Sequence, residues 1–377
     1  MTPIVIPTSP RISVIRLVLA LVAAFIAIFL GLLVLLLIGI ETGPVGFLLG
    51  FLTATIPVPL YIALVLWIDR YEAEPLWLVA TAFFWGALVA TFAAFFLNTT
   101  AQLIVSAVTN ASAGEAFAAV ISAPIVEESG KACILFIIFF WKKDEFDGVI
   151  DGVVYASMVA LGFAMSENIL YYGKAAAAGG GQALTATFIL RGFFAPFSHP
   201  LFTSMTGIGL GLARQSTNLA IKIITPILGL LMAIFMHSIW NGSAVLGGGV
   251  VFMLTYILVM VPAFFIMLIV ISLALRREGQ VVREFLVADL QRGFLTQEEY
   301  KQLGSIFGRM GSSFNALSSS GYKGWRARMR SNQLASELAF HRSRVSRGVY
   351  SADQDVHALE AAYLAALHGL MSEFRAR

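Results

Sequence analysis

Long runs of apolar residues dominate the first three quarters of the chain and leave few folds open to it. The first run extends from about Leu17 to Ile40, and similar runs recur up to about residue 275. Since a helix needs about 20 apolar residues to cross a bilayer, these runs predict membrane-spanning helices. A hydrophobic share of 58% and a mean hydropathy of +0.83 agree with this, being high for a soluble domain. We therefore expect an all-α, polytopic membrane helix bundle.

About eight stretches are long enough to form transmembrane helices. Their approximate ranges are residues 14–40, 45–68, 76–97, 115–140, 149–173, 191–212, 223–245 and 250–275. The first follows Arg11 and Arg16 but is too long for a cleaved signal peptide, so we expect it to remain as a span. With the N-terminus in the cytoplasm, most loop lysines and arginines fall on the cytoplasmic side, as the positive-inside rule requires. An even number of spans then places the C-terminus in the cytoplasm as well.

By composition the chain has three parts: an N-terminal segment with the first span at 1–44, the other spans at 45–275, and a more polar tail at 276–377. In the tail, Thr296 and Glu299 have the spacing of a capping box. Residues 352–374 show helical periodicity, whereas the Ser- and Gly-rich stretch 311–324 predicts a break. We expect a soluble helical appendage that regulates access to the bundle or binds a cytoplasmic partner.

Charge and cysteine content exclude several classes of function. A formal net charge of +3 is small for 377 residues and follows from the loop charges that set topology, so we expect no nucleic-acid partner. Cys133 is the single cysteine, which excludes an intramolecular disulfide and a cysteine-based zinc site. A catalytic serine is not expected either, because no serine lies in a G-x-S-x-G turn.

The most informative residues are polar side chains inside the predicted spans. They are Glu127, Glu128, Lys131, Glu167, Asn168, His199, His237 and Asn241. A charged residue near the bilayer centre costs roughly 2.5 to 3.5 kcal/mol, so three acids and a lysine would cost on the order of 10 kcal/mol if left unpaired. We therefore expect these groups to converge on one another in one buried catalytic or transport cavity.

Helical spacing places several of these groups on shared faces. Lys131 follows Glu127 by four residues and Glu128 by three, so it can neutralise one acid. In the same way, His199 shares a face with Thr203, and His237 shares one with Asn241. A Lys–Glu pair that merely holds helices together would leave the second glutamate unexplained, so we favour a functional site.

Two kinds of chemistry suit this set of residues. In the first, His199, His237 and a glutamate, taken as Glu128, hold a zinc ion that carries water, while a second glutamate acts as base. In the second, no metal is needed: a glutamate activates water, and Asn168 or Asn241 stabilises the oxyanion. The H-E-x-x-H pattern of many zinc proteases is absent, and the sequence leaves both chemistries open.

Taken together and in this order, the patterns E-E-x-x-K, F-x-x-x-E-N, H-x-x-x-T and H-x-x-x-N resemble the PrsW family of intramembrane proteases. The resemblance covers roughly residues 45–275, which it marks as a protease core. It includes 69-DRYEAEPLW and 147-DGVIDGVVYASMVALGFAMSEN. Ala73 and Ala156 stand where proline and glycine are common in the family. The motifs are also similar to those of the CAAX-processing and bacteriocin-processing proteases.

The resemblance implies hydrolysis of peptide bonds in membrane-anchored substrates of a bacterial inner membrane, such as an anti-sigma factor. It implies that Glu127 and Glu128 form the water-activating pair and that His199 and His237 are metal ligands or oxyanion partners. The residues expected to support them are Lys131, Glu167, Asn168, Thr203 and Asn241. Whether the protease uses a metal or a glutamate alone stays open.

Two other functions compete with proteolysis at this stage. The same Glu, His and Lys side chains could serve a proton- or ion-coupled transporter, or could lock helices together in a scaffold without activity. The predicted depths of Glu167 and His199 favour water entry and cleavage near the extracytoplasmic side. Gly207, Gly209 and Gly211 permit close helix approach, either within the chain or in a dimer.

Overall fold

The computed structural model describes residues 14–348 and 355–375. The predicted N-terminal charge Arg11 and the first residues of the predicted helix 352–374 lie outside these ranges. Within the described residues every regular element is a helix, which confirms the all-α prediction. The chain forms two compact units. Among the described residues the first, the membrane unit, covers residues 14–68 and Glu74–Ile269, and the second, the C-terminal unit, contains Asp69–Ala73 and the residues from Val270 onward.

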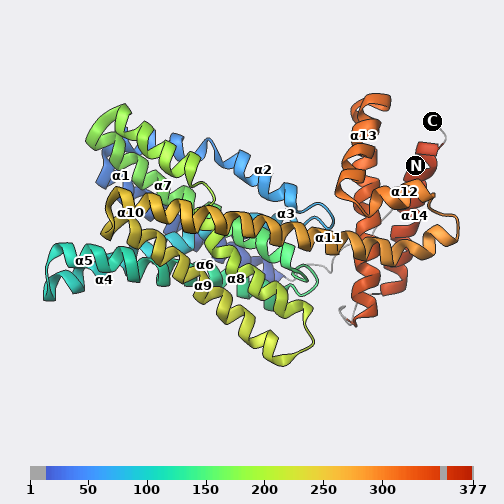
Figure 1. Ribbon diagram of the computed structural model, residues 1–377, viewed down its shortest axis with the longest axis horizontal. Helices are drawn as coiled ribbons and strands as arrows, with labels where there is room; N and C mark the ends of the chain where they lie inside the picture. The colour runs from blue at the N-terminus through green and yellow to red at the C-terminus, as the bar shows by residue number, and fades with distance from the viewer. Residues whose placement is uncertain (1–13, 349–354, 376–377) are drawn as a thin grey trace. The chain divides into compact units, whose positions relative to one another are not determined.

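The helices of the membrane unit follow one another with short connections (Figure 1). Its first half comprises α1 (Val14–Thr55), α2 (Val58–Ile68), α3 (Leu76–Phe84), the π-helix η1 (Trp85–Ala90), α4 (Thr91–Val108), α5 (Ala111–Phe117), the π-helix η2 (Ala118–Ser122) and α6 (Ala123–Trp141). Its second half comprises α7 (Val149–Phe188), the π-helix η3 (Ile189–Phe194), α8 (Ser198–Gln215), α9 (Leu219–Leu246), α10 (Gly248–Thr255), the π-helix η4 (Tyr256–Met260) and the start of α11 (Val261–Gln291).

Among the described residues, five helical segments are long and apolar enough to cross a membrane. They are Leu17–Ile68, Leu76–Val108, Val149–Gln215, Leu219–Leu246 and Gly248–Gln291. The chain is thus a multi-pass membrane protein, but this count does not confirm the prediction of eight spans. Two segments are interrupted, since Gly43 in α1 and Gly180 in α7 have φ angles of 70° and 60°. Such left-handed backbone is available to glycine without steric cost.

Helix α7 is the core of the membrane unit, and nearly all of its first 16 residues are buried. It packs against α1, α3, α6 and α8. Its contact with α8 depends on glycine, because a Cβ on Gly207 would lie 2.0 Å from the carbonyl oxygen of Gly152. Of the two roles considered for the glycines of α8, Gly207 therefore serves packing within the chain.

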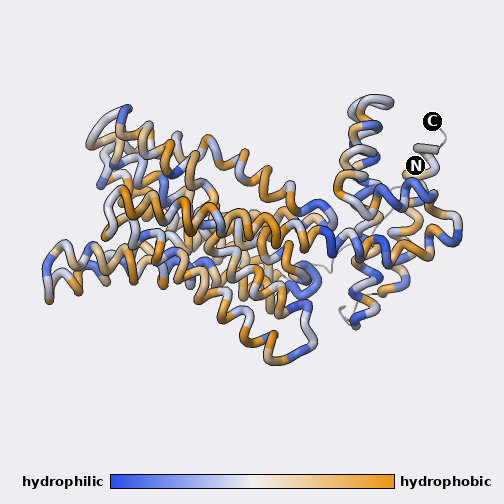
Figure 2. The backbone as a smooth tube through the Cα atoms, in the orientation of Figure 1, coloured by the Kyte–Doolittle hydropathy of each residue, from blue (hydrophilic) through white to orange (hydrophobic). Residues whose placement is uncertain are grey.

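The outer surface of the membrane unit is apolar. In Figure 2 its helices are predominantly coloured as hydrophobic, and large side chains such as Leu32 and Phe96 are exposed. A soluble protein rarely exposes so many large apolar side chains, whereas lipid tails solvate them well. Of the polar residues predicted inside the spans, Glu127, Glu128, Lys131, His199 and His237 are instead buried, and Glu167, Asn168 and Asn241 are partly buried, in keeping with the cost of placing them in lipid.

The C-terminal unit contains the end of α11 with α12 (Gln297–Leu303), α13 (Ile306–Ser346) and α14 (Val356–Arg375). The predicted capping box is confirmed: Thr296 and Glu299 exchange side-chain to backbone hydrogen bonds at the start of α12. The predicted break within 311–324 is confirmed at one residue: Gly321 has non-helical backbone, with φ 62°, and divides α13, whereas the residues on either side of it are helical. A positive φ is open to glycine without steric cost.

Candidate functional site

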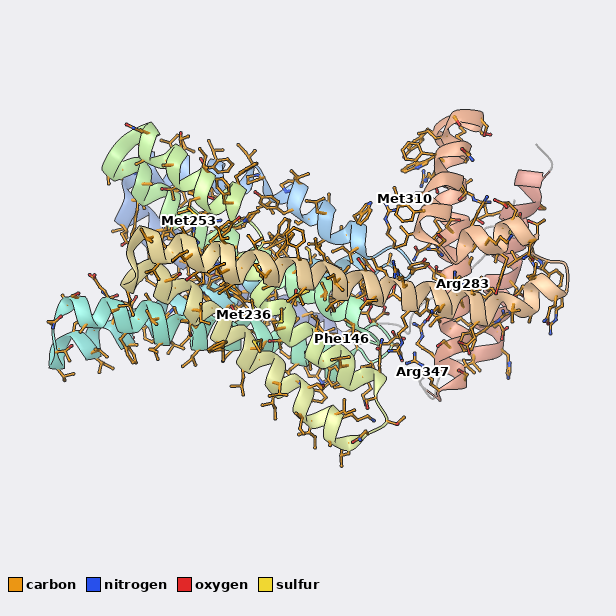
Figure 3. All side chains as sticks on the ribbon, viewed as in Figure 1. Phe146, Met236, Met253, Arg283, Met310 and Arg347 are labelled. Atoms are coloured by element: carbon orange, nitrogen blue, oxygen red, sulfur yellow. The ribbon has the colours of Figure 1, made fainter. Side chains whose placement is uncertain are left out.

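Four helices of the membrane unit bring charged and polar side chains together. Helix α6 supplies two acids and a lysine, and α7, α8 and α9 supply one titratable group each. These groups are Glu127, Glu128, Lys131, Glu167, His199 and His237. Met236, which precedes His237 on α9, marks this part of the bundle in Figure 3. Glu128 and Lys131 are fully buried, at 0% exposure, so their charges have no access to bulk solvent.

Helix breaks place two of these groups. Pro124 lies in the first turn of α6, directly after the π-helix η2, and its missing N–H interrupts the helical hydrogen-bond ladder at this point. The π-helix η3 ends at Phe194, and α8 begins at Ser198, so His199 stands in the first turn of a new helix. π-helical turns occur frequently at functional sites because they change the direction of the side chains that follow.

Glu128 is the best-satisfied acid of the cluster. Its Oε1 accepts a hydrogen bond from Nζ of Lys131 at 2.7 Å and lies 3.0 Å from Nδ1 of His237. Its Oε2 accepts a hydrogen bond from Oγ1 of Thr203 at 2.8 Å. Since a carboxylate can only accept, Nδ1 of His237 carries the hydrogen, and Nε2 keeps a lone pair.

His199 has a partner on each ring nitrogen. Its Nδ1 lies 3.2 Å from Nζ of Lys131, and its Nε2 lies 3.0 Å from Oε2 of Glu167. Because an ammonium group can only donate, Nδ1 is the acceptor and Nε2–H donates to Glu167. The rings of His199 and His237 are 5.2 Å apart, so the two histidines face one site from α8 and α9.

Glu127 differs from Glu128 by having an unsatisfied oxygen. Its Oε1 accepts a long hydrogen bond of 3.4 Å from Asn98 of α4, but its buried Oε2 has no hydrogen-bond donor among the described residues. That oxygen lies 4.0 Å from Nε2 of His237 and 3.8 Å from Nζ of Lys131. Buried polar atoms are nearly always bonded, so an orphaned carboxylate oxygen beside a histidine lone pair indicates a binding position.

The residues could hold a metal ion. One donor atom each from Glu127, His199 and His237 lies within 4.8 Å of the other two, and metal bonds of about 2.0 to 2.2 Å would draw them closer. Oε2 of Glu127 accepts no hydrogen bond, whereas both ring nitrogens of His199 already have partners, one of which a metal would replace. The sequence pointed to Glu128 as the carboxylate ligand, but Glu128 orients His237 from behind, as carboxylates commonly do for metal-bound histidines.

A small polar cavity of about 40 Å³ adjoins the cluster. Its walls include Glu167, Asn168, Arg191, His199 and Asn241. A buried water needs about 10–15 Å³ of such space, so the cavity accommodates a few water molecules. Hydrolysis inside a membrane requires such a supply of water beside the reacting groups.

Of the predicted supporting residues, Glu167, Asn168 and Asn241 line this cavity. Asn168 accepts a hydrogen bond of 2.6 Å from Nε of Arg191, and Asn241 donates from Nδ2 to the carbonyl of Ala119 at 2.9 Å. Lys131 and Thr203 contact Glu128 directly, as described above. The structure thus brings all nine predicted site residues to one region, with Asn168 and Asn241 at its edge.

Arg191 is the main residue that the sequence reasoning missed. Its Nη2 donates to Oε2 of Glu167 at 2.5 Å, and its guanidinium lies 3.9 Å from the centre of the Tyr171 ring. In the sequence it is the first residue of the predicted span 191–212. A basic residue at the start of an apolar run was the one signal that pointed to it.

Asn98 and Phe163 were missed as well. Asn98 bonds both Glu127 and Ser122, and the ring of Phe163 lies 4.1 Å from Nζ of Lys131. No short motif marks Asn98, because it lies on α4, about 30 residues before the glutamates. Phe163 begins the F-x-x-x-E-N pattern, but this pattern does not indicate that its ring contacts the ammonium group of Lys131 on another helix.

Comparisons with known proteins identify the family to which the chain is similar. The family model described as "PrsW family intramembrane metalloprotease" matches residues 74–267, which include every site residue named above. The chain is 37% identical over 146 residues to "Protease PrsW" of Geobacillus kaustophilus, covering 39% of this chain and 58% of that protein. It is 32% identical over 196 residues to "Protease PrsW" of Oceanobacillus iheyensis, covering 52% and 82%. For "Protease PrsW" of Bacillus subtilis the identity is 33% over 152 residues, covering 40% and 63%. No solved structure matches the chain.

Proposed function

Because this chain belongs to the PrsW family of intramembrane metalloproteases, we propose that it hydrolyses peptide bonds of membrane-anchored proteins at the buried Glu/His cluster. The observation that carries the proposal is the unpaired Oε2 of Glu127, which faces Nε2 of His237 at 4.0 Å. The chain matches only 58% and 63% of the length of the relatives from Geobacillus kaustophilus and Bacillus subtilis. We therefore base the proposed activity and substrate on the geometry of the site. Nothing in the comparisons supports the transporter alternative.

In the metal-dependent form of this proposal, Glu127, His199 and His237 would hold a zinc ion. The ion would polarise the scissile carbonyl and lower the pKa of a bound water. Glu128 fixes the His237 tautomer through Nδ1, which keeps Nε2 free to act as a ligand. Glu167 lines the water-sized cavity and is our candidate for the group that accepts the proton of the water.

The metal-free form uses the same side chains differently. Glu127 takes the proton from water with its unpaired Oε2, because both oxygens of Glu128 already accept hydrogen bonds. Lys131 favours the metal-free form, because its ammonium group already places a positive charge 3.2 Å from Nδ1 of His199, near the position that a metal would need. The asparagines Asn168 and Asn241 border the cavity and would stabilise the developing oxyanion.

We propose eight membrane crossings. The segments Leu17–Ile68 and Val149–Gln215 are 52 and 67 residues long, about twice or more what one span needs, and breaks in each support two or more crossings. The segment 111–141, formed by α5, η2 and α6, carries the charged site residues, which explains why apolar composition alone does not select it. With eight crossings, both termini would lie on the cytoplasmic side of a bacterial inner membrane.

The substrate and partners follow from the family and the site. We propose a membrane-anchored substrate of the anti-sigma-factor kind, cleaved near the extracytoplasmic leaflet. The division into residues 1–44, a protease core at 45–275 and a soluble tail at 276–377 belongs to the same proposal. Because the tail is polar in composition, it is our candidate for binding a cytoplasmic partner.

The decisive experiment measures metal and cleavage together. Wild type and a double variant, His199→Ala with His237→Ala, are purified, analysed for zinc and incubated with a single-span reporter, with and without chelator. About one zinc per wild-type chain, absent from the variant, with chelator-sensitive cleavage, establishes the metalloprotease. Metal-free cleavage that still requires Glu127 establishes the glutamate mechanism. A folded wild type that cleaves no membrane-anchored reporter overturns the proposal.

A further inference from the structure

A second and larger cavity lies beside the polar one in the membrane unit. It has a volume of about 360 Å³ and is lined almost wholly by apolar side chains. Aromatic residues dominate the wall, among them Phe197, Trp240, Tyr256 and Phe264. Such a volume falls within the range of ligand-binding pockets and exceeds the roughly 150 Å³ that accommodates a benzene molecule in an engineered cavity.

The two cavities share a wall. Ala195, Pro196, Ser198 and Trp240 line both of them, while His199 and Glu167 face the polar side. A peptide segment whose backbone reaches the polar cavity therefore has a neighbouring side chain within reach of the apolar one. This continuity links the apolar cavity to the site of hydrolysis.

The shared wall is irregular backbone held by side chains. Between η3 and α8, residues 195–197 are not helical, and the hydroxyl of Tyr256 donates to the carbonyl of Phe194 at 3.0 Å. The ring of Phe264 stacks on Phe197 with centroids 6.5 Å apart. Non-helical backbone at membrane depth is tolerated where it lines a cavity, so this break has a structural reason to exist here.

The chemistry of the wall selects an apolar occupant that arrives from the bilayer. The two hydroxyls that line the cavity, of Ser198 and Tyr256, both donate to backbone carbonyls. Phe193 and Phe265 also line it and are 71% and 59% exposed, so it opens toward the lipid-facing surface. A side chain of a membrane-spanning segment can therefore enter without crossing water.

We propose that this cavity is a specificity pocket, which takes one large apolar side chain, Leu, Met or Phe, of the substrate's transmembrane segment next to the scissile bond. This inference rests on the proposed protease function and adds the substrate feature that the enzyme selects. The competing occupant is the acyl chain of a lipid, which would fill the cavity whatever the substrate sequence.

The test uses the purified full chain and a single-span reporter in which each position of the span is replaced in turn by Ala, Leu, Phe or Trp. Wild type is expected to cleave Leu and Phe reporters about tenfold or more faster than the Ala reporter at one position beside the cleaved bond. Val261→Phe narrows the cavity and should remove that preference, whereas Phe264→Ala widens it and should favour Trp. Ile266→Phe is the matched control, since Ile266 is 60% exposed and lies outside the cavity wall.

The outcomes separate the two proposals. If wild type cleaves reporters but Val261→Phe and Phe264→Ala alter all rates by one common factor, the specificity pocket is refuted while the protease stands. Native mass spectrometry adds a second readout: a lipid bound to wild type and lost in Val261→Phe, together with such a common factor, assigns the cavity to an acyl chain. If wild type cleaves none of the reporters, both proposals fail.

Discussion

Nδ1 of His237 lies 3.0 Å from Oε1 of Glu128, and this contact joins α9 to α6 across 109 positions of the sequence. It assigns different roles to two adjacent acids. Glu128 accepts hydrogen bonds from three side chains, whereas Oε2 of Glu127 accepts none. Glu128 therefore holds the site together, and Glu127 is available for chemistry.

This difference predicts opposite effects of two conservative substitutions. Glu127→Gln should abolish cleavage yet leave thermal stability close to wild type, because the altered oxygen has no donor to lose. Glu128→Gln should lower the free energy of unfolding by about 3–5 kcal/mol, because the buried Lys131 would lose its ion pair of 2.7 Å and keep only the longer contact of 3.8 Å with Glu127. Thermal unfolding in detergent and reporter cleavage measure both. Equal loss of stability in the two variants would support the scaffold interpretation instead.

Arg191 is expected to matter for activity through Glu167. Arg191→Gln removes the ion pair with Glu167 and alters the contact with Asn168, so the carboxylate beside the water-sized cavity loses its orientation. We expect cleavage to fall by about 10- to 100-fold, in the range of outer-shell partners. Lys174→Gln is the control, because Lys174 forms an exposed pair with Glu41 that should contribute little. Unchanged cleavage in Arg191→Gln would remove Arg191 from the site.

Close packing of α7 on α8 predicts a strong effect of one methyl group. Gly207→Ala places a Cβ 2.0 Å from a carbonyl oxygen of α7 and should destabilise the protein by about 1–3 kcal/mol through overpacking. Gly181→Ala adds the same methyl group where no heavy atom lies within 4 Å, and should be nearly neutral. Melting temperatures of the two purified variants provide the comparison. A neutral Gly207→Ala would mean that the two helices pack less tightly than described.

The C-terminal unit depends on one buried arginine. Arg309 donates to the backbone carbonyls of Leu303, Arg70 and Asn332, and it stacks on Tyr71. Burial lowers the pKa of Arg309 to about 10, which still leaves it charged at neutral pH.

We expect Arg309→Met to loosen this unit, because three buried carbonyls would lose a donor at about 1–3 kcal/mol each. Limited proteolysis should then cleave the tail faster than in wild type. Arg326→Met is the control, because the side chain of Arg326 is exposed. Equal protease resistance of both variants would show that Arg309 does not hold the unit together.

Local patterns in the sequence predicted much of this protein. Apolar length predicted membrane helices, and the capping box at Thr296 and Glu299 was readable because its partners are three residues apart. The cost of burying charge predicted that Glu127, Glu128, Lys131 and the histidines would meet. These inferences succeed because helix periodicity and desolvation act on residue types whose spacing is known from the chain alone.

Tertiary structure decided the rest. Which glutamate faces a free histidine nitrogen depends on how α6, α8 and α9 are rotated against one another, and spacing along one helix cannot show this. Arg191 joined the site because η3 carries it to Glu167, and within 311–324 only Gly321 interrupts the helix. The sequence by itself determined that these polar groups must pair within a helical membrane bundle. Only the folded structure determined which atoms pair and which carboxylate oxygen is left without a hydrogen bond, because that depends on contacts between residues far apart in the chain.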